Sequence, residues 1–151
     1  EEVIAQVGSF KVDFGQQNLN FFSNLLAAMF NSVTLVDEPP VPPEQMAGLD
    51  GVLVPEIVKF GFLTPGISGL NFYSASIHYR LTLFGRDGSK LADWTVVGYG
   101  KAEATAFGND EALKQATLLA IRDGGARIAL EMPAEPAFAA WIAAQGAPEA
   151  R

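Results

Sequence analysis

Hydrophobic and polar residues alternate most regularly between Tyr73 and Thr105. Such alternation is typical of strands that bury one face, because successive side chains of a strand point to opposite sides of the sheet. One face of the first run carries Ile77, Tyr79, Leu81 and Leu83, and the other carries Ser76, His78, Arg80 and Thr82. Between the two runs, Asp87-Gly88 offers the positive φ angle that a hairpin turn needs at low steric cost. The pattern predicts a long antiparallel hairpin, around which the rest of the chain is arranged.

Two segments show the spacing of helices that bury one side. The first covers residues 18–30 and begins with Asn18, whose side-chain oxygen can cap the free amides of the first turn. The second begins at Asn109 and places acidic residues in its first turn, where the helix dipole favours negative charge. Its buried stripe is expected to consist of Leu113, Ala116, Thr117, Ala120, Ile121, Gly124 and Ile128. The small residues of this stripe should bring the helix close to the sheet, and Gly124-Gly125 is expected to kink or fray it.

Three further runs are strand candidates by their apolar content. They cover residues 3–14 with a bend at Gly8, residues 32–36, and residues 51–62. Pro55 lacks an amide hydrogen, so it favours an edge or a bulged strand for the last of these runs.

The remaining segments are connections and a tail. The proline-rich residues 37–44 are expected to be extended polyproline II, and the glycine-rich residues 64–71 to form a turn. Pro133 ends the second helix. Pro136 and Gly146 then bracket an apolar stretch with proline at its start and glycine at its end, which predicts a short third helix.

Together these elements predict an α+β fold. We expect an antiparallel or mixed sheet of four to five strands that contains the long hairpin, with two main helices packed on one face and a short C-terminal helix. The chain has 151 residues, which is enough for one domain with a substantial core. Residues 1–132 are expected to form this single domain, and residues 133–151 a C-terminal tail that holds the short helix.

Composition narrows the classes of function. The formal net charge is −7 and no cluster of Lys and Arg is present, so we expect no nucleic-acid partner and no electrostatic docking on anionic lipid. The chain contains no cysteine, which excludes disulfides, thiolate catalysis and cysteine-ligated zinc within it. No apolar run is long enough to span a bilayer.

Candidate catalytic groups are few. His78 is the only histidine, and it lies on the polar face of a predicted strand. A catalytic triad would need a nucleophile and a carboxylate close to it in space. Paired carboxylates of a hydrolase would come from Glu56, Asp93 and Glu103, each placed where a solvated strand face would carry it. We therefore expect no catalytic, cofactor-binding or metal-ligating residues, and we expect that the chain is not an enzyme.

Two apolar segments fall where connections usually carry polar residues. Their candidate partner-contact residues are Phe60, Phe62, Leu63, Ile67, Leu70, Phe138, Trp141 and Ile142. These side chains either form contact surfaces or close over the core of the domain itself. In addition, an edge strand that contains Pro55 would leave backbone donors and acceptors open, which predicts a homo-oligomer or a strand-sharing complex.

The predicted order of strand, helix, strands, long hairpin and helix resembles the lipopolysaccharide-assembly lipoproteins of the bacterial envelope. The resemblance rests on the run Tyr73-Ser-Ala-Ser-Ile-His-Tyr79, similar to a Tyr-x-x-x-Ile/Val-x-Tyr strand, and on the alanine-rich helix over residues 109–130. It covers residues 3–130, while the lipidated cysteine of that family is absent from this sequence.

This resemblance implies a non-enzymatic accessory or assembly subunit that acts by protein–protein contacts in a periplasmic or outer-membrane complex. Its partners would be other envelope proteins or further copies of itself, and any membrane association would come from a lipid anchor outside the given sequence. The alternative is a carrier of a small molecule or lipid, or an enzyme, with a pocket between sheet and helices. This alternative is based on the high aromatic content of the chain together with Gly98 and Gly100, which lack side chains and could leave a cavity.

Overall fold

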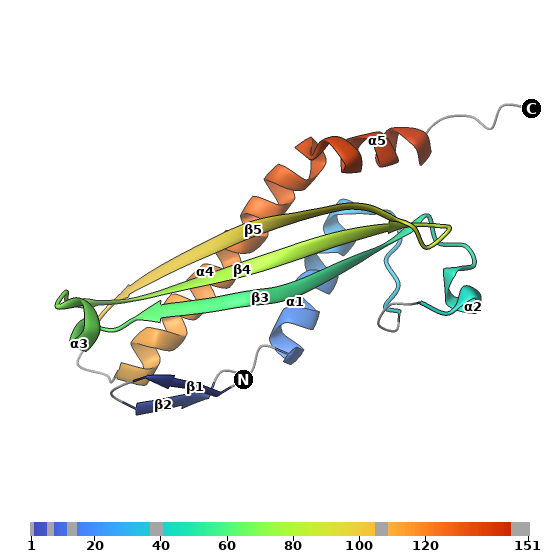
Figure 1. Ribbon diagram of the computed structural model, residues 1–151. Coiled ribbons are helices and arrows are strands. Elements are labelled where there is room, and N and C mark those ends of the chain that lie inside the picture. The colour runs from blue at the N-terminus through green and yellow to red at the C-terminus, as the bar shows by residue number, and fades with distance from the viewer. Residues whose placement is uncertain (1, 6–7, 12–14, 37–40, 105–108, 146–151) are drawn as a thin grey trace, which may run out of the picture.

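A computed structural model describes residues 2–5, 8–11, 15–36, 41–104 and 109–145. Its centre is an antiparallel sheet with the strand order β3-β4-β5. The three strands are β3 (Gly51–Leu63), β4 (Phe72–Gly85) and β5 (Lys90–Glu103). Figure 1 shows these strands curving together, with α1 and α4 on one side of them. The predicted α+β class, the long hairpin and the antiparallel pairing are confirmed.

Within these described ranges the main sheet has three strands, fewer than the four to five that we expected. The single strand expected over residues 3–14 is instead a separate ribbon of β1 (Glu2–Ala5) and β2 (Gly8–Lys11), which pair with each other. Residues 32–36 form no strand. A short run with strand propensity needs a neighbouring strand to bond with, and local pattern does not reveal whether one is present.

Two connections contain single helical turns. Within the expected polyproline segment, residues 37–40 lie outside the described residues, and α2 (Pro43–Met46) follows. In the expected glycine-rich turn, α3 (Pro65–Ser68) forms because proline suits the first turn of a helix. It ends at Gly69, whose φ of 70° is a left-handed conformation that glycine adopts at little cost.

The face of the sheet toward the helices holds the core. The helices there are α1 (Gly15–Met29) and α4 (Asn109–Glu131), and the predicted stripe of α4 is buried. The buried hydrophobic side chains of β4 are Tyr73, Ala75, Ile77, Tyr79, Leu81 and Leu83. The Tyr79 hydroxyl donates a hydrogen bond to Asn18 Oδ1 at 3.1 Å, and the Tyr79 ring meets the ring of Phe22 at 5.3 Å between centroids. Burial raises the pKa of Tyr79 above its ordinary value, so this phenol stays neutral.

Helix α4 lies in direct backbone contact with β5. A Cβ atom added to Gly98 would lie 2.6 Å from the backbone nitrogen of Gly124, and one added to Gly100 would lie 2.5 Å from that of Ala120. The expectation that small residues bring this helix close to the sheet is confirmed, and the two strand glycines make the close approach possible. The helix is continuous through Gly124-Gly125, where a kink or fraying was expected. Both helix glycines instead make room for aromatic rings, those of Tyr79 and Phe21.

The C-terminal segment packs on the same core. A 3₁₀ turn, η1 (Met132–Ala134), leads to α5 (Pro136–Gln145), which is the predicted short helix. Phe138 is 3% exposed and its ring lies against those of Phe30 and Trp94. The indole N–H of Trp141 donates to the carbonyl oxygen of Asp50 at 3.3 Å. Among the described helices, none combines the length and the apolar character that crossing a membrane requires.

Candidate functional site

The connection between β3 and β4 contains α3 and lies at one end of the sheet (Figure 1). Three of its aliphatic side chains are exposed. Leu63 is 45% exposed, Ile67 51% and Leu70 53%. We call these three residues the apolar tip. Hydrogen bonds within the connection hold it in place, since the Ser68 hydroxyl donates to the Thr64 carbonyl and accepts from the Leu70 amide. The apolar side chains are therefore displayed on an ordered turn.

The apolar tip lies in an uncharged part of the chain. No Asp, Glu, Lys or Arg occurs between Lys59 and Arg80. At the edge of this region, the Lys101 ammonium lies 4.0 Å from the centroid of the Phe72 ring, a cation–π contact. A neutral aliphatic surface can be covered by a partner without desolvating a charge, which is typical of the centre of protein–protein interfaces.

The aromatic residues of this connection behave differently from the aliphatic ones. Phe60 and Phe62 are half-buried, pair in register with Ile77 and Ala75, and pack against the core. Their ring centroids lie 6.1 Å apart. Of the predicted contact residues in the connection, only the three aliphatic ones are exposed, and the two aromatic ones support the strand.

The predicted contact residues of the tail lie elsewhere. Trp141 is half-buried over Gly51, at the start of β3, whereas Leu63 ends that strand. Ile142 is 43% exposed, and Phe138 is enclosed by the core. Phe138 is thus inaccessible to a partner in this fold, because its ring fills the space between α5 and the sheet. The structure does not bring the tail residues and the apolar tip together.

The candidate catalytic groups lie on the outer face of the sheet, the face opposite the helices. His78 pairs in register with Lys59 and Val97, and Glu56 pairs with Arg80. The three carboxylates considered for a hydrolase are spread along the face, since Asp93 and Glu103 lie opposite the distant positions 82 and 72 of β4. Asp93 instead accepts a hydrogen bond from Lys90 at 2.7 Å, which lowers the pKa of its carboxyl. Among the described residues, no group of three or more His, Asp or Glu side chains is placed to hold a metal ion.

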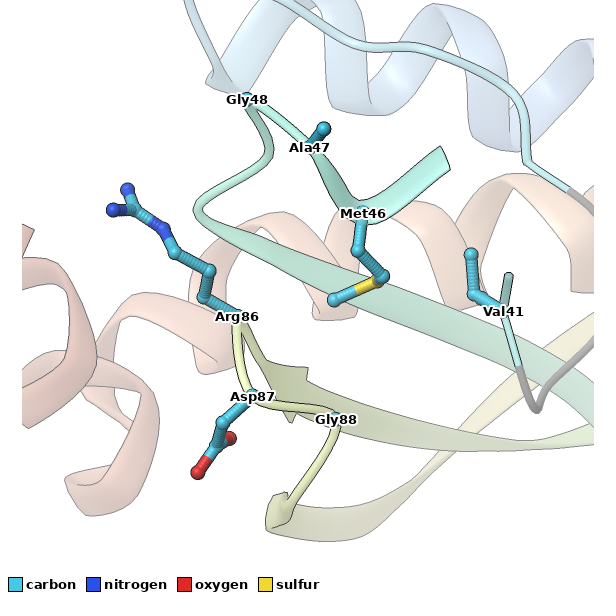
Figure 2. A pocket seen from close by; sticks show the side chains of 7 residues that line it. All are labelled: Val41, Met46, Ala47, Gly48, Arg86, Asp87 and Gly88. Atoms are coloured by element: carbon cyan, nitrogen blue, oxygen red, sulfur yellow. The ribbon is translucent and has the colours of Figure 1, made fainter. Parts of the chain in front are cut away.

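A surface hollow of about 480 Å³ lies between the α2 segment and the turn of the β4–β5 hairpin (Figure 2). Its lining residues are Val41, Met46, Ala47, Gly48, Arg86, Asp87 and Gly88. The charged groups here hold the turn and the loop together. Arg86 donates to Asp50 Oδ1 at 2.6 Å, and Asp87 accepts from the amide and the hydroxyl of Ser89. The pocket considered earlier, beside Gly98 and Gly100, has no space at those glycines because the α4 backbone lies against them.

The two edges of the sheet differ in how they are covered. On β5, the Tyr99 amide donates to Asp123 Oδ2 at 2.9 Å, and the same carboxylate oxygen accepts from Arg127 Nε at 3.0 Å. The Tyr99 N–H bond is the main reason that the pKa of Asp123 lies below its ordinary value. On β3, Glu56 and Lys59 are exposed next to a β-bulge between Ile57 and Lys59. Sequence reasoning missed the Asp123 contact, because no local pattern links a helix carboxylate to a strand amide.

The fold and these surfaces define a two-layer α+β protein with an apolar tip and one strand edge that bears charged side chains. The chain matches no protein-family model and no curated protein.

Proposed function

We propose that this chain is a non-enzymatic accessory or assembly subunit of a bacterial cell-envelope complex, and that it acts by protein–protein contacts. The observation that supports a contact role is the apolar tip, in which three large aliphatic side chains are exposed at the end of β3 and in the hydrogen-bonded turn that follows it. Burial of such surface stabilises a complex by about 25 cal/mol per Å² before the costs of association.

The envelope setting is supported by the resemblance of the sequence to lipopolysaccharide-assembly lipoproteins. In this proposal the protein is periplasmic, and attachment to the outer membrane is supplied by a lipid anchor outside the given sequence. The partner contributes an apolar surface that covers the tip, because three side chains are too few to form a large interface alone.

The test is capture of partners by the immobilised protein from separate envelope and cytosolic extracts. We expect a complex with envelope proteins that is lost when Ile67 and Leu70 are both changed to Ser. Leu130→Ser is the matched control, because Leu130 is 77% exposed on α4 and lies outside the tip. A tight complex with a cytosolic enzyme and none with envelope proteins would contradict the proposal, as would equal losses in the tip and control variants.

A further inference from the structure

We infer that the edge of β3 pairs with β3 of a second copy of this chain, antiparallel and across a two-fold axis located at the β-bulge. Strand β3 is an edge of the sheet and extends over 13 residues. The opposite edge strand, β5, has its Tyr99 amide bonded to Asp123 and its inner side against α4. An edge strand offers backbone donors and acceptors to another strand, so β3 is the edge at which the sheet can be extended.

Because of the position of the bulge, the outer faces of the two sheets lie on the same side of the dimer. Before the bulge, Val54 and Glu56 lie on the outer face, opposite even-numbered residues of β4. After the bulge, Lys59 and Gly61 lie on that same face. A two-fold axis between Ile57 and Val58 therefore sets outer-face residues of one copy opposite outer-face residues of the other. In a regular strand the same register would oppose residues of different faces, because side chains alternate with period two.

This register also matches charges. Glu56 of each copy lies opposite Lys59 of the other, so one complementary pair is repeated on both sides of the axis. Both side chains are exposed, and neither forms an ion pair within the described part of the chain. Opposite charges directly across two strands are favourable, and like charges there are unfavourable.

The irregular features of β3 favour a second copy over a foreign strand. Pro55 removes one amide donor, and a bulge increases the local twist, so a straight regular strand fits this edge poorly. In a dimer of two copies, both strands have a bulge at the axis and the same local twist, so their shapes match. The pairing is thus selective for the chain itself.

Charge variants test the register through the dimer dissociation constant, measured by sedimentation at several protein concentrations. We expect the unmodified protein to dimerise, and Glu56→Lys or Lys59→Glu alone to weaken the dimer at least tenfold, since each creates two like-charge pairs. The double variant E56K/K59E should restore the original affinity. Mixing the two single variants should also give a dimer, because their charges are complementary to each other and not to themselves.

A cysteine cross-link provides a second test that does not depend on charge. The chain contains no cysteine, so Val58→Cys places a unique thiol beside the proposed axis. Mild oxidation should link two copies of this variant, whereas Thr95→Cys on β5 should stay unlinked. The inference would be overturned if the protein were a monomer at every concentration. It would also be overturned if the dissociation constant were unchanged in all charge variants and the Val58→Cys variant formed no cross-link. Ile67 and Leu70 follow β3 and lie outside the paired strand, so I67S/L70S should leave this dimer intact even if the proposed envelope contact is lost.

Discussion

The two edge strands of the sheet, β3 and β5, are stabilised in different ways. Strand β5 has glycines against the backbone of α4, and a helix carboxylate accepts one of its edge amides. Strand β3 has half-buried apolar residues toward the helices and charged residues on its outer face. Helix α4 therefore both covers the core and protects one edge of the sheet. The other edge, β3, keeps its exposed charged side chains and its β-bulge. Three pairs of variants test these differences between the regions of the sheet.

The largest effect is expected at the contact between α4 and β5. Gly100→Ala should lower the free energy of unfolding by about 3 kcal/mol or more, because the new methyl group would overlap the helix backbone and force the layers apart. Gly61→Ala on β3 is the matched control, since the nearest atom to its added Cβ is the mobile Ser76 hydroxyl at 3.1 Å. We expect the control to change stability by less than about 1 kcal/mol. Urea unfolding measures both, and equal losses would show that the two edges do not differ in this respect.

A smaller effect is expected from the apolar connection at the end of β3. Phe62→Ser should cost about 2 kcal/mol, because a half-buried ring that packs on the core is lost. Ile67→Ser should stay within about 0.5 kcal/mol of the unmodified protein, because this side chain is exposed. Melting temperatures of the two variants would separate the part of the connection that supports the core from the part available to partners. A large loss for Ile67→Ser would mean that the apolar tip itself stabilises the fold.

The smallest effect is expected at the covered edge of β5. The Tyr99 amide and then Arg127 hold the pKa of Asp123 below its ordinary value. A carboxyl whose pKa is lower in the folded state stabilises the fold above its unfolded pKa of about 3.9, and this contribution is lost as pH falls through the folded pKa. Asp123→Asn should therefore cost a few tenths of a kcal/mol near pH 7, since solvent screens the site, and nothing in strong acid.

The control for this last change is Asp93→Asn. The Asp93 carboxylate also has a lowered pKa, but it accepts its hydrogen bond from Lys90 and not from a backbone amide. Both variants should show the pH-dependent loss in thermal unfolding, but only Asp123→Asn should speed hydrogen exchange of the Tyr99 amide. Unchanged exchange at Tyr99 would show that Asp123 does not protect the β5 edge.

Much of the fold could be predicted from local pattern. Alternation placed Ile77, Tyr79 and Leu81 on the buried face, and the spacing of small residues identified the side of α4 that meets the sheet. The number of strands could not be predicted, because within the described part of the chain residues 32–36 have strand propensity but form no strand, and β1 and β2 pair with each other and not with the main sheet. Local pattern reports what a segment can form, and the pairing of strands depends on distant segments.

The candidate surfaces were predicted in part. The sequence showed which connection is unusually apolar, but it did not separate Phe62, which packs on the core, from Ile67, which is exposed. Side chains a few residues apart in a turn differ in burial because of the path of the backbone, which Gly69 and α3 set here. The position of the β-bulge relative to Glu56 and Lys59 likewise depends on the register with β4.

The covering of β5 by α4 also bears on the order of folding. Helix α4 follows strands β4 and β5 in the chain, and a short turn joins the two strands, so that their pairing can start from positions as close as Phe84 and Lys90. Contacts of low sequence separation cost little loop-closure entropy, so segments rich in them tend to fold early as a cooperative unit. In a nascent chain β3 is made before this unit and has to wait for β4 to emerge. If the proposed dimer forms, the edge of β3 is then the last part of the sheet to be paired, and two chains made side by side would meet through it.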